Sequence, residues 1–212
     1  MSTQTKIQTE VTNIRSLSWQ AWNSFLFSYR NKNNIIDAGY LDYEKLTDAL
    51  KDKSGEIHNL FLTHWHIDHI ARLEKLLEIF PKMVCHIHQK EKIFLEKSEY
   101  NLSELYKEDF LLNKKYFANI KTFNDWDIID WVKIIHTPGH TIWSTCFYIE
   151  ELEICFTWDT MFSDAYWRTD LPTWNLEEMK TSLARLFELP PETVIYPWHM
   201  ESKVLGDIKI YF

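Results

Sequence analysis

Glycine is scarce in this chain, which has only 4 glycines among 212 residues, whereas average usage would give roughly 15. Cysteine is sparse as well, because Cys85, Cys146 and Cys155 form an odd set without a CxxC pair. Such a set excludes a disulfide framework and a thiolate zinc site. The three thiols are therefore expected to be reduced and to lie in the core.

Long hydrophobic runs and excess basic charge are also missing. No segment has the roughly 18 uninterrupted apolar residues of a membrane span, and the opening residues have no apolar signal-peptide core. We therefore expect no membrane partner and a cytoplasmic location. The chain has 23 Lys and Arg against 31 Asp and Glu, a net charge of −8. This balance argues against nucleic acid as a partner, because phosphate binding needs clustered basic residues.

What is present is typical of a globular protein, with 45% hydrophobic and 25% charged residues. No repeat, linker or low-complexity tract interrupts the chain, so we expect one domain over residues 1–212. Apolar runs predict strands at 24–29, 34–37, 57–63, 84–87, 120–123, 132–136, 146–149, 153–157 and 193–196. Helical spacing occurs at 70–80 and 176–187, and residues 89–115 are expected to be mixed helical. This order predicts an α+β or layered α/β sandwich.

The strongest motif is an HxHxDH cluster formed by His64, His66, Asp68 and His69. It follows a predicted strand and precedes a predicted helix. Residues two apart on an extended segment point the same way, so His64 and His66 can bind one ion together. Asp68 and His69, at the turn into the helix, can face a second ion. Imidazole and carboxylate suit zinc, with iron and manganese as weaker alternatives.

Three later motifs strengthen this interpretation: TPGHT at 137–141, TWDT at 157–160 and YPWH at 196–199. Together with HxHxDH, in this order, they make the chain resemble the metallo-β-lactamase fold superfamily. The resemblance implies a four-layer αββα sandwich with a dinuclear metal site at one edge of the sheets. It puts His64, His66 and His140 on the first metal, Asp68, His69 and His199 on the second, and Asp159 between both. It also implies that Asp37 orients a ligand.

The remaining motif concerns the reaction. Residues 168–172, RTDLP, resemble a segment of small glyoxalase II-like hydrolases. The implied activity is hydrolysis of a small thioester, in which two zinc ions hold a bridging hydroxide and polarise the carbonyl. Asp159 and Asp68 are the candidate catalytic residues, and Asp159 would orient the hydroxide and take its proton. The acyl and thiol parts of the substrate and the oligomeric state are left open. His58, His86, His88 and His136 match no motif and are interpreted as structural.

Three other functions stay open at this stage. A mononuclear iron persulfide dioxygenase shares the fold and binds its ion with two histidines and one aspartate. A lactone or β-lactam hydrolase would use the same ligands as the thioesterase. A catalytically inactive binding module, with its metal site blocked by tryptophan, is the third alternative. Metal content, oxygen uptake and substrate profiling separate them.

Tryptophan, in contrast to glycine, occurs 10 times, and converting all ten would bring glycine to 14. In the family motifs Trp143, Trp158, Trp167 and Trp198 each stand where glycine is expected. Glycine beside metal ligands accepts positive φ and close approach, which an indole tolerates poorly. Our hypothesis is that UGA codons read as glycine in the source were translated as tryptophan. These four positions should then include positive φ, or indoles in solvent or in the metal cleft. Met200 also replaces a family glycine, and recoding does not explain it.

Overall fold

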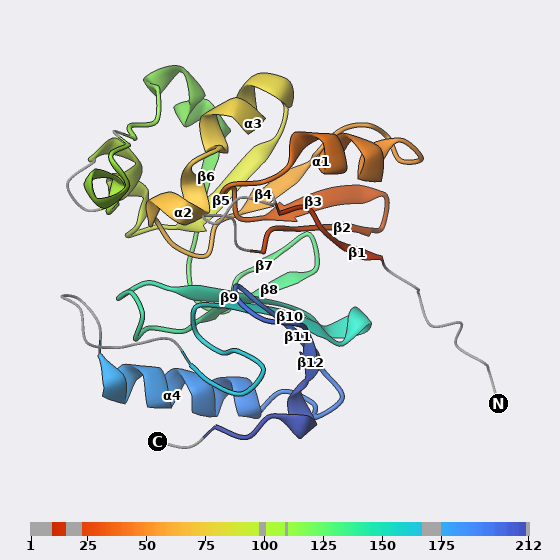
Figure 1. Cartoon of the computed structure of the whole chain (residues 1–212), viewed down its shortest axis with the longest axis vertical. Helices are drawn as coiled ribbons and strands as arrows, with labels where there is room; N and C mark the ends of the chain where they lie inside the picture. Colours follow the sequence, from red (N-terminus) through yellow and green to blue (C-terminus); the bar gives the residue numbers. More distant parts are fainter. Residues whose placement is uncertain (1–9, 16–22, 98–100, 109, 167–174, 211–212) are drawn as a thin grey trace.

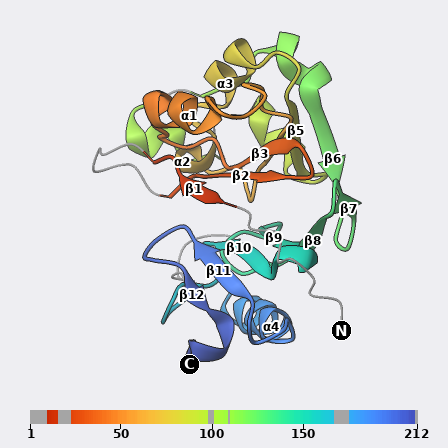
Figure 2. The ribbon, with the colours of Figure 1, turned by 90° about the vertical axis from the view of Figure 1, so that its right-hand side faces the viewer.

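Two six-stranded sheets face each other between outer layers of helices (Figure 1, Figure 2). The computed structural model describes residues 10–15, 23–97, 101–108, 110–166 and 175–210. Helices α1 (Tyr43–Leu50), α2 (Ile67–Ile70) and α3 (Leu73–Ile79) lie outside the first sheet, and α4 (Leu176–Phe187) lies outside the second. The predicted four-layer αββα sandwich is confirmed. No helix within the described ranges is long and apolar enough to cross a membrane.

The first sheet has its strands in chain order, β1 to β6. The first three strands pair antiparallel, and β3 to β6 pair parallel. Their bounds are β1 (Val11–Asn13), β2 (Phe25–Tyr29), β3 (Lys32–Ile36), β4 (Asn59–Phe61), β5 (Val84–His88) and β6 (Ile120–Phe123). The predicted strand at 57–63 is shorter than expected, because the chain leaves the sheet before the histidine motif begins.

The second sheet has the order β12-β11-β10-β9-β8-β7 and is antiparallel except for the pair β10 and β11. Its strands are β7 (Ile128–Ile129), β8 (Val132–His136), β9 (Thr145–Ile149), β10 (Ile154–Trp158), β11 (Val194–Pro197) and β12 (Lys203–Val204). Because β8 and β10 are both antiparallel to β9, they run in the same direction as β11. The carboxyl ends of these three strands therefore share one edge of the sheet.

Three apolar clusters join the layers. The cluster between the sheets is rich in aromatic residues, including Phe27, Phe61 and Phe147, all fully buried. The other two clusters lie between each sheet and its helices. Burying one such side chain contributes about 1.5–3 kcal/mol. This packing fixes the strand ends that carry the candidate ligands.

Side-chain caps define where the two longest helices begin. The Asp42 carboxylate accepts from the first turn of α1, and Asn175 does the same for α4. Such caps are each worth about 1 kcal/mol. The mixed region at 89–115 contains the 3₁₀ helices η1 (Lys92–Glu96) and η3 (Ser103–Tyr106), and η4 (Lys114–Asn119) begins at its end. Left-handed residues flank η3 on both sides, which prevents a longer helix there.

Candidate metal centre

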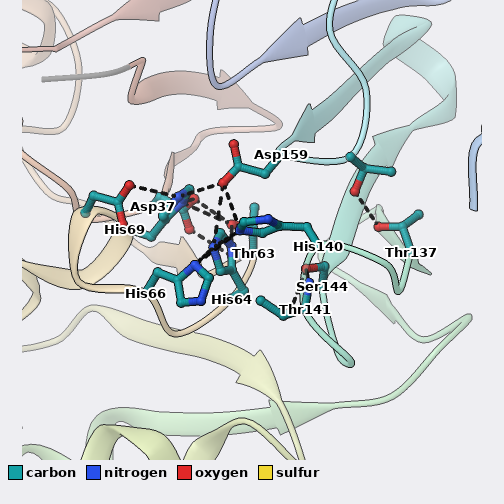
Figure 3. A network of polar contacts seen from close by, with 12 residues as sticks. Asp37, Thr63, His64, His66, His69, Thr137, His140, Thr141, Ser144 and Asp159 are labelled. Atoms are coloured by element: carbon teal, nitrogen blue, oxygen red, sulfur yellow. Dashed lines mark hydrogen bonds and ion pairs between the residues drawn. The ribbon is translucent and has the colours of Figure 1, made fainter. Parts of the chain in front are cut away.

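The candidate ligands lie in the segments that follow strand ends, and Figure 3 shows His64, His66, His69, His140 and Asp159 pointing toward one another. His64 and His66 follow β4, and Asp68 and His69 lie in α2, which begins directly after His66. His140 lies between β8 and β9, Asp159 follows β10, and His199 follows β11. Strand ends of both sheets thus bring these distant segments together.

Three histidines form the first group of converging ligand atoms. His64 Nε2 is 3.0 Å from His66 Nδ1 and 3.2 Å from His140 Nε2. His66 Nδ1 and His140 Nε2 are 3.1 Å apart. All three imidazoles are buried. The expected pairing of His64 and His66 on one ion is consistent with this geometry, with His140 as the third ligand.

Asp159 joins this first group to a second one, formed by His64, His69 and Asp159 itself. Its Oδ2 is 3.1 Å from His69 Nε2, 3.4 Å from His140 Nε2 and 3.7 Å from His64 Nε2. Its Oδ1 is buried and has no hydrogen-bond partner among the described residues. One carboxylate therefore faces both groups of imidazoles.

Asp68 and His199 lie farther from the converging ligand atoms. Asp68 Oδ2 is 3.8 Å from His69 Nε2, and its side chain is 17% exposed. His199 belongs to neither group of converging ligand atoms in the described part of the chain. Its ring packs edge-on against Phe162 with 5.3 Å between the centroids. The structure thus brings five of the seven predicted ligands together, with Asp68 beside them and His199 apart.

Asp37 and Thr63 orient two of the ligating rings. The buried Asp37 carboxylate accepts from His69 Nδ1 at 2.6 Å and from Thr63 Oγ1 at 2.7 Å. Because the Thr63 hydroxyl donates to Asp37, it accepts from His64 Nδ1 at 3.0 Å. In the neutral state of each ring these partners favour the proton on Nδ1, which leaves Nε2 as the atom that can bind a metal. The role expected for Asp37 as an orienting residue agrees with these contacts.

The electrostatics also favour a cation. Burial lowers the pKa of His64 and His140 well below the usual range, and lowers that of His66 to about 3. These imidazoles are therefore neutral at neutral pH. Burial opposes the charge on His69 too, but nearby carboxylates, above all that of Asp37, raise its pKa to about 10. Without a metal, His69 carries the positive charge that balances the acidic groups.

The donor set fits divalent metal. Neutral imidazole nitrogens that converge on a carboxylate oxygen are the ligands that zinc and iron prefer. The buried Asp159 Oδ1, which lacks a hydrogen-bond partner within the described ranges, is a further unused donor. The residues present are thus suited to hold the metal ions that the sequence predicts.

A buried glutamate supports the His140 loop, and sequence reasoning missed it. Glu91 is fully buried, and its Oε1 accepts from Thr141 Oγ1 at 3.1 Å. Thr141 Oγ1 lies 2.6 Å from Ser144 Oγ, which also accepts from the Thr141 backbone N–H. Burial raises the pKa of Glu91 well above its usual range. No motif marks Glu91, since only the fold brings it to residues 50 positions away.

Two of the few glycines are required by close approach at this edge. A Cβ on Gly39 would lie 2.0 Å from the backbone oxygen of Asp68. Gly139 has φ +137, and a Cβ there would lie 2.6 Å from the backbone of Met179 in α4. At both glycines the backbone therefore packs directly against another backbone segment, and only glycine fits there.

The tryptophans near the ligands occupy this same crowded edge. Trp158 has φ 39 and Trp198 is buried with its ring stacked on His69, with 3.9 Å between the ring centroids. The expectation of left-handed φ or of an indole in the metal cleft is confirmed at these two positions. Trp143 has no positive φ and stacks on His88. Trp167 lies outside the described residues.

The four histidines interpreted as structural all lie outside the converging groups. His58 Nδ1 accepts from the Asn33 backbone N–H, and His86 Nε2 pairs with Asn59 Oδ1. His88 and His136 stack on each other, with 5.5 Å between the centroids. These contacts agree with the interpretation from the sequence.

Comparisons with known proteins point in the same direction. A family model described as the metallo-beta-lactamase superfamily matches residues 19–199. The chain is 28% identical over 177 residues to the probable metallo-hydrolase M6_Spy0554 of Streptococcus pyogenes, covering 81% of this chain and 75% of the relative. It is 29% identical over 157 residues to a hydroxyacylglutathione hydrolase of Bartonella tribocorum, covering 74% of this chain and 54% of that enzyme. Among solved structures, TTHA1623 in a di-iron-bound form matches with a TM-score of 0.79 and 24% identity, covering 93% of this chain and 96% of the other.

Proposed function

The chain belongs to the metallo-β-lactamase superfamily, and on that premise we propose that it is a dinuclear zinc hydrolase that cleaves a small thioester. The observation that carries the proposal is the place of Asp159 Oδ2, within 3.1 Å of His69 Nε2 and 3.4 Å of His140 Nε2. A carboxylate oxygen between two sets of imidazoles can bridge two ions. Two zinc ions bound there would polarise the thioester carbonyl and activate water.

The distances between ligand atoms support the ligand set proposed for the first ion and part of the set proposed for the second. His64, His66 and His140 hold the first ion, which their mutual distances of 3.0–3.2 Å support. Asp68, His69 and His199 hold the second, and Asp159 bridges both. For His199 this requires a side-chain position different from its present packing against Phe162.

The acidic residues have separate roles in this proposal. Asp159 Oδ1 is buried and has no hydrogen-bond partner in the described part of the chain, so it is placed to accept the proton that the attacking water loses. The Asp68 side chain, in contrast, is 17% exposed. Asp68 therefore lies on the side of the centre that solvent reaches and helps to orient the water.

The choice of substrate and metal rests on two kinds of support. A relative named as a hydroxyacylglutathione hydrolase favours a thioester, and neutral imidazoles favour zinc. Iron and manganese are the alternatives, and TTHA1623 is a neighbour in fold that binds two irons. The three buried, free cysteines suit a reducing compartment, so the cytoplasm is the proposed location. We further propose that residues 1–212 form one domain.

One other function has a specific observation in its favour. The group formed by His64, His69 and Asp159 consists of two histidines and one carboxylate, as in mononuclear iron oxygenases. A persulfide dioxygenase is therefore the second candidate. It needs a single iron, whereas the hydrolase needs two ions.

The test compares zinc-loaded protein, made with glycine at the ten tryptophan positions, with its Asp159→Asn variant. Elemental analysis should give close to two zinc equivalents for the former, and the zinc protein should hydrolyse S-lactoylglutathione or a smaller lactoyl thioester. The variant should lose one equivalent and nearly all turnover. One bound iron together with oxygen uptake on a persulfide would replace the hydrolase by the dioxygenase. No turnover of thioesters, lactones or β-lactams at full metal loading would refute the hydrolase.

A further inference from the structure

In the hairpin between β7 and β8, a tryptophan has a backbone conformation that favours glycine. Ile129 pairs with Val132, so Asp130 and Trp131 form a two-residue loop with φ 47 and φ 69. Positive φ at both central residues defines a type I′ turn, in which Asp-Gly and Asn-Gly are strongly preferred. The backbone geometry of this turn favours glycine at residue 131 independently of any family motif. Trp131 lies far along the chain from every candidate ligand loop except that of His140.

A second hairpin in the same protein serves as an internal comparison. Tyr29 pairs with Lys32, and the loop between them has φ 47 at Arg30 and φ 64 at Asn31. Asparagine is one of the few residues that tolerates this conformation. Asn31 thus suits the left-handed backbone conformation of its turn, whereas Trp131 does not.

The same violation recurs at two other tryptophans. Trp126 has φ 68 in an exposed turn, and Trp158 has φ 39 directly before Asp159. Four of the ten tryptophans lie outside the described residues, which leaves six, and three of these six have left-handed φ. Only a few per cent of non-glycine residues do so. Met200 also has φ 69, and reading UGA as glycine does not explain that position.

The buried tryptophans carry a second sign of misfit. Trp158 and Trp198 are each 1% exposed, and neither Nε1 has a hydrogen-bond partner among the described residues. Buried indole N–H groups normally find an acceptor. Trp198 also covers one face of the His69 ring, and its Cη2 would lie 3.1 Å from a Cβ at residue 39. The Trp198 indole therefore takes up space where the ligands converge, whereas the Trp158 indole packs against Phe25 and Phe156 between the sheets.

We propose that the ten tryptophan positions are glycine in the protein that the cell makes, because it reads UGA codons as glycine. Glycine relieves the left-handed backbone at residues 126, 131 and 158 and removes two unsatisfied indoles. It also opens the space beside His69 into which His199 can move to complete the second metal position. This last step rests on the proposed dinuclear function, whereas the identity of the residues does not.

The identity is tested on the native protein and its gene. Trypsin releases residues 122–133 as one peptide, because Lys121 and Lys133 flank it, and this peptide carries both Trp126 and Trp131. Mass spectrometry of the protein purified from its source should find glycine at both positions, and the gene should carry UGA there. The peptide 116–121, which has no tryptophan, is the control and should have the mass calculated from its sequence. Tryptophan at either position, or UGG codons, overturns the proposal.

The effect on stability is tested with matched variants of the chain that has tryptophan at all ten positions. Trp131→Gly should raise Tm by about 2–4 °C or more, although it removes the stacking of Arg30 on the indole at 4.6 Å. Asn31→Gly, at the equivalent turn position, should change Tm by only about 1 °C. A fall in Tm for Trp131→Gly contradicts the proposed strain.

The metal consequence needs its own comparison. A chain with glycine at all ten positions should bind about two zinc equivalents by elemental analysis. The chain with tryptophan at these positions should bind about one. Equal binding by both chains refutes the proposed opening of the second position. Glycine in the native peptide with a single zinc in the ten-glycine chain would keep the assignment of residues and reject the dinuclear function.

Discussion

The contact between Asp37 and His69 allows a sharp test of the metal centre by the substitution Asp37→Asn. The carboxylate is fully buried and accepts from His69 Nδ1 at 2.6 Å, from Thr63 Oγ1 at 2.7 Å and from the Thr63 backbone N–H at 2.8 Å. Asp37 has φ 56, which asparagine tolerates as well as aspartate. The substitution therefore removes one charge and one acceptor atom without new backbone strain.

The expected magnitude follows from the lost acceptor. Metal binding requires a neutral His69 ring, and an amide nitrogen in place of Asp37 Oδ2 cannot accept from Nδ1, so the proton of that neutral ring is held at Nε2. That nitrogen faces Asp159 at 3.1 Å and is the atom that would bind metal. Losing such a partner costs about 10–100-fold in metal affinity, or about 1.4–2.8 kcal/mol. The metal-free protein should lose about 3–5 kcal/mol of stability, because the charge on the buried His69 loses its partner.

The matched control is Asp130→Asn. Asp130 also has positive φ, and its Oδ2 accepts from Lys32 Nζ at 2.6 Å and from Asn59 Nδ2 at 2.9 Å. Zinc affinity is measured by competition with a chelator at neutral pH, and stability by denaturant unfolding of the metal-free proteins. Asp37→Asn should weaken zinc binding, and Asp130→Asn should lower stability alone. Wild-type zinc affinity in Asp37→Asn would refute the orienting role.

Three further results are expected. Asp159→Ala should lower turnover by about 10²–10⁴-fold and remove one metal equivalent, which kinetics and elemental analysis check. Glu91→Ala should weaken zinc binding because Thr141 loses its acceptor, whereas Glu91→Gln should restore it in the same titration. The metal-free protein should lose stability as the pH falls from about 6.5 toward 4, because burial lowers the pKa of His66 to about 3 and of His86 to about 4. The unfolded chain then binds protons that the folded chain does not, and His86→Gln should flatten this dependence in denaturant titrations.

The metal motif and most strands are predictable from the sequence because their signals are local. His64 and His66 lie two apart after an apolar strand, and this spacing alone places both rings on one side. The helix at 176–187 shows a regular apolar period and agrees with α4 (Leu176–Phe187). In such segments local spacing and tertiary packing favour the same structure.

What was missed depends on contacts between distant segments. α1 (Tyr43–Leu50) was not predicted, although Asp42 caps it, because only Leu46 and Leu50 are buried and the apolar period is short. The strands β1, β7 and β12 are two or three residues long and are defined by their partners. Glu91 meets Thr141 only after both sheets have formed. No window of the sequence contains that contact.

The burial that prepares the centre for metal also makes the metal-free protein less stable. Desolvation keeps His64, His66 and His140 neutral, so their lone pairs are available at neutral pH without loss of a proton. The same burial removes polar nitrogens from solvent, which opposes folding. His64 and His66 follow a strand of the first sheet, and His140 and Asp159 follow strands of the second. An ion bound between them therefore stabilises the contact between the two sheets, in proportion to its binding free energy. Removing metal should weaken the packing of one sheet on the other and not only the catalytic edge.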